Sequence, residues 1–101
     1  MKIQDKRIVV TGAASGIGKA LCEAFYKAEA KSIVCVDMNI EGATDTAKNV
    51  KGLAVQANVG NEEDIINVIE KANNYSGGVD IFCSNAGIGG VPGFFEVETK
   101  D

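Results

Sequence analysis

Histidine is absent from this chain of 101 residues, and its three cysteines are not spaced as metal ligands. Without histidine, the chain can build neither a Cys-His nucleophile nor a zinc site of the usual kind. Cys35 and Cys83 stand inside apolar runs, and Cys22 falls among helical positions. We interpret all three as small buried side chains that stay reduced, and we predict no metal site.

Long apolar runs and basic clusters are missing as well. No apolar run is long enough to span a bilayer, and the charged start at residues 1–7 is not followed by the apolar segment of a secretory signal. The net charge of −4 argues against nucleic acid or an anionic membrane surface as a partner. A composition with 46% hydrophobic and 24% charged residues is typical of one folded domain, and we expect a cytoplasmic protein.

Four short apolar runs predict four strands, at residues 7–11, 32–37, 53–57 and 79–84. The second run is apolar at consecutive positions, which is typical of a parallel strand that is buried on both faces. Because a helical pattern separates each run from the next, the order β-α-β-α-β-α-β predicts a parallel sheet with helices on both faces. We therefore predict an α/β fold of the doubly wound type. Residues 94–101 are too few to assign.

The intervals between these runs have the spacing of amphipathic helices. The first helix is predicted to bury Ile17, Ala20, Leu21, Ala24, Phe25 and Ala28. The second helix, at residues 40–49, is predicted more weakly because Gly42, Thr44 and Thr46 are mediocre helix formers. Asn61 is predicted to cap the third helix. The buried stripe of that helix is predicted to be Ile65, Ile66, Val68, Ile69 and Ala72.

Three glycines stand between the first predicted strand and the first predicted helix. Gly12 allows a tight exit from the strand, Gly16 has no Cβ and lets a pyrophosphate approach the backbone, and Gly18 lets the helix pack closely on the strand. The helix N-terminus adds free N–H groups and the positive end of a dipole, which favour a phosphate. We interpret this turn as a dinucleotide site; the alternative is a tight turn that only suits packing.

Asp37 ends the second predicted strand, about 20 residues after Gly18. An acid at that distance can accept hydrogen bonds from the adenosine ribose hydroxyls, whereas the 2′-phosphate of NADP would meet a like charge there. The alternative is that Asp37 only begins a turn through Met38 and Asn39. We predict NAD as the cofactor.

The glycine spacing, the leading Thr11 and the Ser-Gly-Ile-Gly ending at residues 15–18 resemble the short-chain dehydrogenase/reductase family. The resemblance covers the whole chain and implies a Rossmann-type sheet, partial here, with strand order 3-2-1-4. It implies that Ser15 and Ile17 contact the cofactor phosphates and ribose, and that Thr11 and Asn85 brace the turn and the central strands by hydrogen bonds. The family's two usual basic positions for NADP correspond to Ser15 and Met38, which are uncharged.

The same resemblance implies cofactor contacts at two further places. Asn58-Val59 stands where family members often have Asp-Val, with the acid at adenine N6; the Asn58 oxygen can still accept from N6–H, and a simple turn cap is the alternative. The backbone of Asn85-Ala86-Gly87 is implied to line the path of the two riboses, in addition to ending a strand. In the family this triplet usually follows Asn, where this chain has Ser84.

Catalysis in the family, by resemblance, needs a Tyr with a Lys four residues later, together with a Ser and an Asn. The chain has only Tyr26 and Tyr75, and neither is followed by Lys at that spacing. We therefore expect no catalytic residue and no turnover from residues 1–101 alone. We expect this domain to be the N-terminal, cofactor-binding part of a longer protein, with its fourth strand left here as an open apolar edge.

Three functions follow as hypotheses. The first is an NAD-dependent oxidoreductase that interconverts a secondary alcohol and a ketone by hydride transfer, with this chain supplying cofactor binding only. The second is a non-enzymatic dinucleotide-binding or redox-sensing module, and the third is a structural domain that keeps its glycines for packing. We favour the first on the resemblance. We expect as partners a small alcohol or ketone and further copies of the protein, in a homodimer or homotetramer.

Overall fold

The computed structural model describes residues 2–85 and, in backbone only, residues 93–96. In chain order its elements are β1 (Arg7–Thr11), α1 (Gly16–Lys27), β2 (Ser32–Asp37), α2 (Ile40–Val50), β3 (Leu53–Gln56), α3 (Glu62–Ser76), β4 (Ile81–Ser84) and β5 (Gly93–Glu96). β1 and β2 begin and end where the sequence predicts, whereas β3 ends earlier and β4 begins later. The weakly predicted α2 forms with Asn39 as its cap, and Asn61 caps α3 as predicted.

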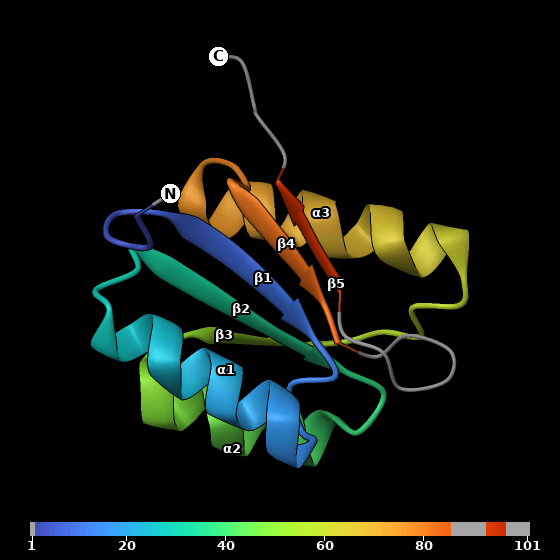
Figure 1. Cartoon of the computed structure of the whole chain (residues 1–101). Helices are drawn as coiled ribbons and strands as arrows, with labels where there is room; N and C mark the ends of the chain where they lie inside the picture. The colour runs from blue at the N-terminus through green and yellow to red at the C-terminus, as the bar shows by residue number, and fades with distance from the viewer. Residues whose placement is uncertain (1, 86–92, 97–101) are drawn as a thin grey trace.

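β1 lies at the centre of a sheet whose order is β3-β2-β1-β4-β5. β2 and β4 pair parallel with β1 on either side, so that Thr11 stands level with Val36 and Ser84. The predicted α/β fold with a parallel 3-2-1-4 sheet is confirmed, and the carboxyl ends of the four parallel strands meet at one edge. Figure 1 shows α1 and α2 against one face of this sheet and α3 against the other.

β5 is a strand that the sequence pattern does not predict. It pairs antiparallel with β4, and the pairing runs from Ile81 opposite Glu96 to Ser84 opposite Gly93. The expectation that β4 would be an open edge in this chain is therefore wrong. Pairing at a sheet edge uses the free backbone N–H and C=O groups of the edge strand, so a short segment can join it without a long periodic pattern of its own.

The core has two layers, one on each face of the sheet. Ile8 and Val10 of β1 belong to the layer under α1 and α2, whereas Val9 belongs to the layer under α3 together with Val68 and Ala72. This division follows from the alternation of side chains along a strand. The continuous apolar run in β1 and β2 is therefore explained by burial on both faces, as expected of a parallel sheet.

The three cysteines lie together in the layer under α1. Cys22 of α1 and Cys35 of β2 have their Sγ atoms 3.8 Å apart. All three are buried and free, which confirms the interpretation of them as small core residues. Burial also raises the pKa of the Cys83 thiol, so this group stays protonated at neutral pH.

The buried face of α1 differs from the predicted one. Gly18, Cys22 and Phe25 are buried, whereas Ile17 is 58% exposed and Ala20, Ala24 and Ala28 are exposed. The reason is the contact of Gly18 with the turn after β1, where a Cβ on Gly18 would lie 1.9 Å from Gly12 O. This close approach sets the rotation of the helix about its axis, so that Gly18 and the residues four and seven positions later face the sheet.

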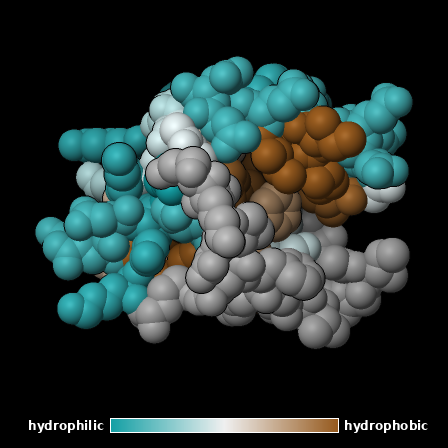
Figure 2. Space-filling view, turned by 90° about the horizontal axis from the view of Figure 1, so that it is seen from above, coloured by the Kyte–Doolittle hydropathy of each residue, from teal (hydrophilic) through white to brown (hydrophobic). Residues whose placement is uncertain are grey.

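The predicted stripe of α3 is also only partly buried. Val68 and Ala72 are buried, but Ile66 is 51% exposed and Ile69 is 39% exposed. Successive helical residues are rotated by about 100°, so Ile66 lies about 160° around the helix from Val68. A single helix packed on one face of the sheet buries a narrower stripe than the sequence pattern predicts. Figure 2 shows an apolar patch beside the hydrophilic surface on this side of the molecule.

Arg7 and Asp80 join the beginnings of β1 and β4 at the amino edge of the sheet. The Arg7 guanidinium donates from Nε and Nη2 to the two carboxylate oxygens of Asp80, both at 2.9 Å, and from Nη1 to Gly77 O at 3.0 Å. The backbone N–H of Arg7 donates to the same carboxylate at 2.8 Å. These hydrogen bonds outweigh the effect of burial and lower the pKa of Asp80 from its ordinary 3.8 to about 2.

We expect Asp80→Asn to lower the free energy of unfolding by about 1 to 2 kcal/mol at neutral pH, because it breaks a charge-assisted pair. The unfolded carboxyl takes up its proton at a higher pH than the folded one. The contribution of Asp80 is therefore present above pH 3.8 and is lost as the pH falls through about 2. The difference between wild type and variant, measured by urea unfolding over a series of pH values, should disappear at the acid end.

Asp45→Asn is the control for this measurement, because Asp45 is an exposed acid on α2. It should change the free energy of unfolding by less than about 0.5 kcal/mol. An effect of Asp80→Asn that persists undiminished below about pH 2 would contradict the account based on charge.

Candidate functional site

The turn between β1 and α1 lies at the carboxyl edge of the sheet. Gly12 has a φ of 67°, in the left-handed region, which lets the chain turn sharply after Thr11. Ser15 caps α1: its hydroxyl donates to Gly12 O at 2.7 Å and accepts from the Gly18 N–H at 3.1 Å. A side chain of the turn itself therefore closes the turn.

Gly16 and Gly18 stand in opposite surroundings. A Cβ on Gly18 would lie 1.9 Å from Gly12 O, so no larger residue allows α1 to approach the turn this closely. A Cβ on Gly16 would have no atom within 4 Å, so the backbone there is open to a molecule that binds from outside. Close packing at Gly18 is as the sequence predicts, and the approach of a pyrophosphate to the open backbone at Gly16 stays a prediction.

Two backbone donors at the start of α1 have no partner in the part of the chain that the structure describes: the N–H groups of Gly16 and Ile17. α1 also has no acidic residue in its first turn, whereas α2 has Glu41 and α3 has three acids there. No side-chain charge in that turn offsets the positive end of the α1 dipole. The start of α1 can therefore receive an anion.

Asn85 braces this turn from the end of β4. Its backbone N–H donates to Thr11 Oγ1 at 3.0 Å, and its side-chain Nδ2 donates to Gly12 O at 3.3 Å and to Ser15 Oγ at 3.0 Å. The bracing role that the resemblance implied for Thr11 and Asn85 is thus present as hydrogen bonds. The Ser15 hydroxyl, in turn, has its single donor and both acceptor positions in use.

Asp37 reaches from the end of β2 to the same turn. Its Oδ2 accepts from the Ala14 N–H at 2.9 Å, and its Oδ1 accepts from the Asn39 N–H at 2.9 Å. The second bond is the turn through Met38 and Asn39 that stood as the alternative for this residue. The first bond fixes the carboxylate beside the glycine-rich turn, and each oxygen keeps a lone pair for a further donor.

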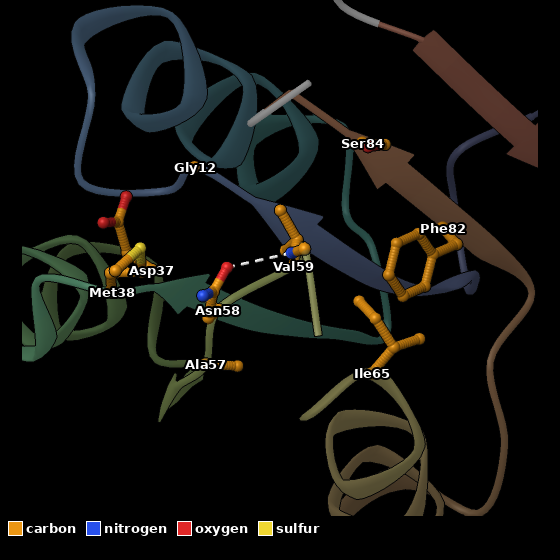
Figure 3. A pocket seen from close by; sticks show the side chains of 10 residues that line it. Gly12, Asp37, Met38, Ala57, Asn58, Val59, Ile65, Phe82 and Ser84 are labelled. Atoms are coloured by element: carbon orange, nitrogen blue, oxygen red, sulfur yellow. Dashed lines mark hydrogen bonds between the residues drawn. The ribbon is translucent and has the colours of Figure 1, made fainter. Parts of the chain in front are cut away.

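A pocket of about 450 Å³ lies at the ends of the four parallel strands. Its lining residues are Gly12, Asp37, Met38, Ala57, Asn58, Val59, Gly60, Ile65, Phe82 and Ser84. Figure 3 shows the Asp37 carboxylate on the side of the glycine-rich turn and the side chains of Ile65 and Phe82 at the other end. One end of the pocket is therefore acidic and the other apolar. This suits a ligand that has hydrogen-bond donors at one end and an apolar surface at the other.

The structure brings most of the predicted site residues to this edge. Five line the pocket: Gly12, Asp37, Met38, Asn58 and Val59. Four form the cap and first turn of α1: Ser15, Gly16, Ile17 and Gly18. Asn85 is buried behind the turn. Ala86 and Gly87 lie outside the described residues.

Ile65 and Phe82 line the pocket, whereas the sequence predicts only that Ile65 belongs to the buried stripe of the third helix and that residue 82 belongs to the fourth strand. Both are partly buried, Ile65 on α3 and Phe82 on β4, next to the layer under α3. Alternation in β4 puts Phe82 on the opposite face from Cys83, which is the face that α3 covers. That alternation was a usable signal, because the pocket opens between α3 and the ends of the strands.

Asn58 shapes the turn that follows β3. Its Oδ1 accepts from the Gly60 N–H at 2.9 Å, the bond drawn in Figure 3, and its backbone N–H donates to Asp64 Oδ2 at 2.8 Å. The turn cap that stood as the alternative for Asn58 is therefore present. The oxygen keeps one lone pair, and a contact with adenine stays a prediction.

Tyr26 stands near the end of α1 and Tyr75 near the end of α3, and neither lines the pocket. Among the described residues, no three Cys, Asp or Glu side chains are grouped so that they could hold a metal ion. None of the helices in that part of the chain is both long enough and apolar enough to cross a bilayer.

Comparison with known proteins decides the family. The family model described as short chain dehydrogenase matches residues 6–101. The chain belongs to this family. Among its relatives is the uncharacterized oxidoreductase YuxG of Bacillus subtilis, 36% identical over 103 residues, which are 95% of this chain and 15% of YuxG. Another is the (+)-cis,cis-nepetalactol synthase of Nepeta racemosa, 36% identical over 90 residues, which are 86% of this chain and 33% of the synthase.

A solved structure shows the same fold. The 3-ketoacyl-(acyl-carrier-protein) reductase of Brucella melitensis, complexed with NADH, matches with a TM-score of 0.75 and 35% identity. The match covers 79% of this chain and 33% of the reductase. The chain thus spans a third or less of the length of these three proteins. It carries the oxidoreductase fold of the family and its Rossmann-like cofactor-binding region.

Gly18→Ala and Gly16→Ala form a matched pair that tests the geometry of the turn. We expect Gly18→Ala to lower the free energy of unfolding by about 2 kcal/mol or more, because the new methyl group would overlap Gly12 O. Gly16→Ala should leave stability unchanged or raise it by up to about 1 kcal/mol, because Ala is the better helix former and meets no atom. Chemical unfolding of both variants measures the difference, and equal effects would contradict the close approach of α1.

Proposed function

We propose that this chain holds the adenosine diphosphate part of NAD in an oxidoreductase that interconverts a secondary alcohol and a ketone. One observation carries the proposal: the open backbone at Gly16, the α1 donors that have no partner among the described residues, and the Asp37 carboxylate stand around one hydrogen-bonded turn. Beside that turn lies a pocket at the carboxyl ends of parallel strands, where open α/β sheets bind their ligands. The NADH named for the Brucella reductase adds support, because its fold matches this one.

The pyrophosphate is proposed to lie against the start of α1. The N–H groups of Gly16 and Ile17 would donate to its oxygens, and the positive end of the dipole of α1, whose first turn has no acidic residue, favours the negative charge. Gly12 and Gly18 keep the turn tight enough for this approach. The Ser15 hydroxyl is fully used within the turn, so a contact from Ser15 to a phosphate would replace one of these bonds.

The ribose of the adenosine is proposed to donate its hydroxyls to Asp37. The carboxylate already lies beside the turn, and its free lone pairs can accept two more hydrogen bonds. A 2′-phosphate would face this negative charge, and the neighbouring Met38 and Ser15 offer no positive charge to balance it. These charges favour NAD over NADP.

The remaining contacts extend from this core of the site. We propose Asn58 and Val59 beside the adenine, with the apolar end of the pocket at Ile65 and Phe82 suited to an aromatic base. Asn85 holds the turn, and the backbone of Ala86 and Gly87 is proposed to follow the cofactor toward its second ribose. When it is bound, the nicotinamide ring supplies or accepts the hydride.

The chemistry itself is proposed to need residues that this chain does not have. The relatives include an oxidoreductase and a synthase by name, so membership of the family does not fix the reaction. The role of residues 1–101 is therefore cofactor binding, without turnover of their own. We propose a small alcohol or ketone as substrate of the whole protein and a homodimer or homotetramer as its assembly. Free thiols in the core accord with a reducing, cytoplasmic compartment.

Titration with NAD and NADP tests the proposal directly. Isothermal calorimetry on this chain should show saturable binding of NAD, and binding of NADP at least about tenfold weaker, because of the like charges at Asp37. A mixture of the chain, NAD and a panel of secondary alcohols should form no NADH. Absence of saturable NAD binding would leave packing as the sole role of the glycines, and formation of NADH would show that the chain does have catalytic residues.

Met38→Arg tests the choice of cofactor without disturbing the hydrogen bonds of Asp37. Met38 is 64% exposed, so the fold should accept the longer side chain. A guanidinium there can pair with a 2′-phosphate, and we expect the affinity ratio of NAD to NADP to fall by about tenfold. Met38→Leu is the control and should leave the ratio unchanged. The same ratio in both variants would place the 2′ position away from Met38.

A further inference from the structure

Helix α2 packs directly against the glycine-rich turn. A Cβ on Gly42, in the first turn of α2, would lie 2.5 Å from the Cβ of Ala14. One turn later, Thr46 is 1% exposed, and its Oγ1 lies 2.9 Å from the carbonyl oxygen of Ala13. The sequence singles out Thr46 only as a mediocre helix former, so its long-range contact is a feature that the structure adds.

The Thr46 hydroxyl has one proton and two acceptors within reach. Ala13 O lies at 2.9 Å, and Gly42 O, in its own helix, lies at 3.2 Å. The nearer acceptor belongs to the glycine-rich turn, 33 residues earlier in the chain. Thr44, in contrast, donates within its own helix, to Ile40 O at 2.7 Å. Of these two threonines of α2, the buried Thr46 reaches the glycine-rich turn, and the half-buried Thr44 donates only within the helix.

The same helix is also tied to the acid at the end of β2. Its cap residue Asn39 donates its backbone N–H to Asp37 Oδ1, and the Asn39 side chain accepts from the Gly42 N–H. Asp37 Oδ2 in turn accepts from the N–H of Ala14. Hydrogen bonds thus join the glycine-rich turn to Asp37, and Asp37 to the start of α2. The bond from Thr46 to Ala13 joins α2 back to the turn.

We propose that Thr46 is a positioning residue for the cofactor: by holding Ala13 O against α2, it adds to the bonds from Ala13 N–H to Val36 O and from Ala14 N–H to Asp37, and so helps to set the position of the pyrophosphate turn relative to the ribose acid. The proposal rests on the proposed function, because both subsites are those of the adenosine diphosphate. A ligand that touches both subsites should then bind more weakly without the Thr46 bond, whereas a ligand that touches one should not.

Thr46→Val tests this role, because valine keeps the shape and loses the donor. We expect the affinity for ADP, which reaches both the turn and Asp37, to fall about fivefold. The affinity for adenosine, which reaches Asp37 only, should stay within twofold. Both are measured by chemical-shift titration of the isotopically labelled chain. Thr46→Ser keeps the hydroxyl and should restore the affinity for ADP, and Thr44→Val, which removes only a bond within the helix, is the control.

Each result decides between the proposal and its alternatives. Equal losses for ADP and adenosine, or a loss in Thr44→Val as large as in Thr46→Val, would mean a general structural role and would overturn the proposal. Unchanged ADP binding in Thr46→Val would overturn it as well, while the proposed function stands if wild type binds ADP and NAD. If wild type binds neither, both fail. If Thr46→Val does not fold, Thr46→Cys, whose thiol is a weaker donor, replaces it. Its affinity for ADP should fall by less than about fivefold, and its affinity for adenosine should stay within about twofold.

Discussion

The contact between α1 and the turn after β1 depends on the missing side chain of Gly18. Because Gly12 O occupies the space of a Cβ, helix and turn lie closer than two ordinary residues allow. This contact sets the rotation of α1, which buries Cys22 and Phe25 and leaves Ile17 outside. It also holds the first turn of α1 at the carboxyl edge, where the N–H groups of Gly16 and Ile17 have no hydrogen-bond partner among residues 2–85.

The sequence predicts the positions of the helices and strands better than it predicts which face of each helix is buried. The bounds of β1 and β2 follow directly from apolar runs, and the glycines and Asp37 come together because parallel strands end at one edge. The exposed Ile17 and Ile66 do not follow from helical spacing. The spacing of apolar residues along a helix defines an apolar stripe that is about 100° wide or more. Which part of that stripe is buried depends on how the helix packs against the rest of the fold.

The hydrogen bonds of the site show a second limit of sequence reasoning. For both Asp37 and Asn58, the sequence is compatible with a contact to the cofactor and with a hydrogen bond that closes a local turn. The structure contains the turn hydrogen bond of each residue. These two roles are not exclusive, because a carboxylate or amide oxygen has two lone pairs. The bond from Thr46 to Ala13 crosses between α2 and the turn, and no local pattern in the chain indicates it. β5 likewise depends on an edge that only the folded sheet provides.

The double use of the Asp37 carboxylate has a consequence for how cofactor preference can change in evolution. This side chain accepts from the N–H groups of Ala14 and Asn39, so the residue that we propose for recognition of the ribose is also a part of the scaffold. A lineage that exchanged it for a neutral residue to admit a phosphorylated ribose would leave two amides without their acceptor. Such a change would need a compensating polar group nearby, so a replacement of Asp37 should be accompanied in evolution by a second replacement beside it.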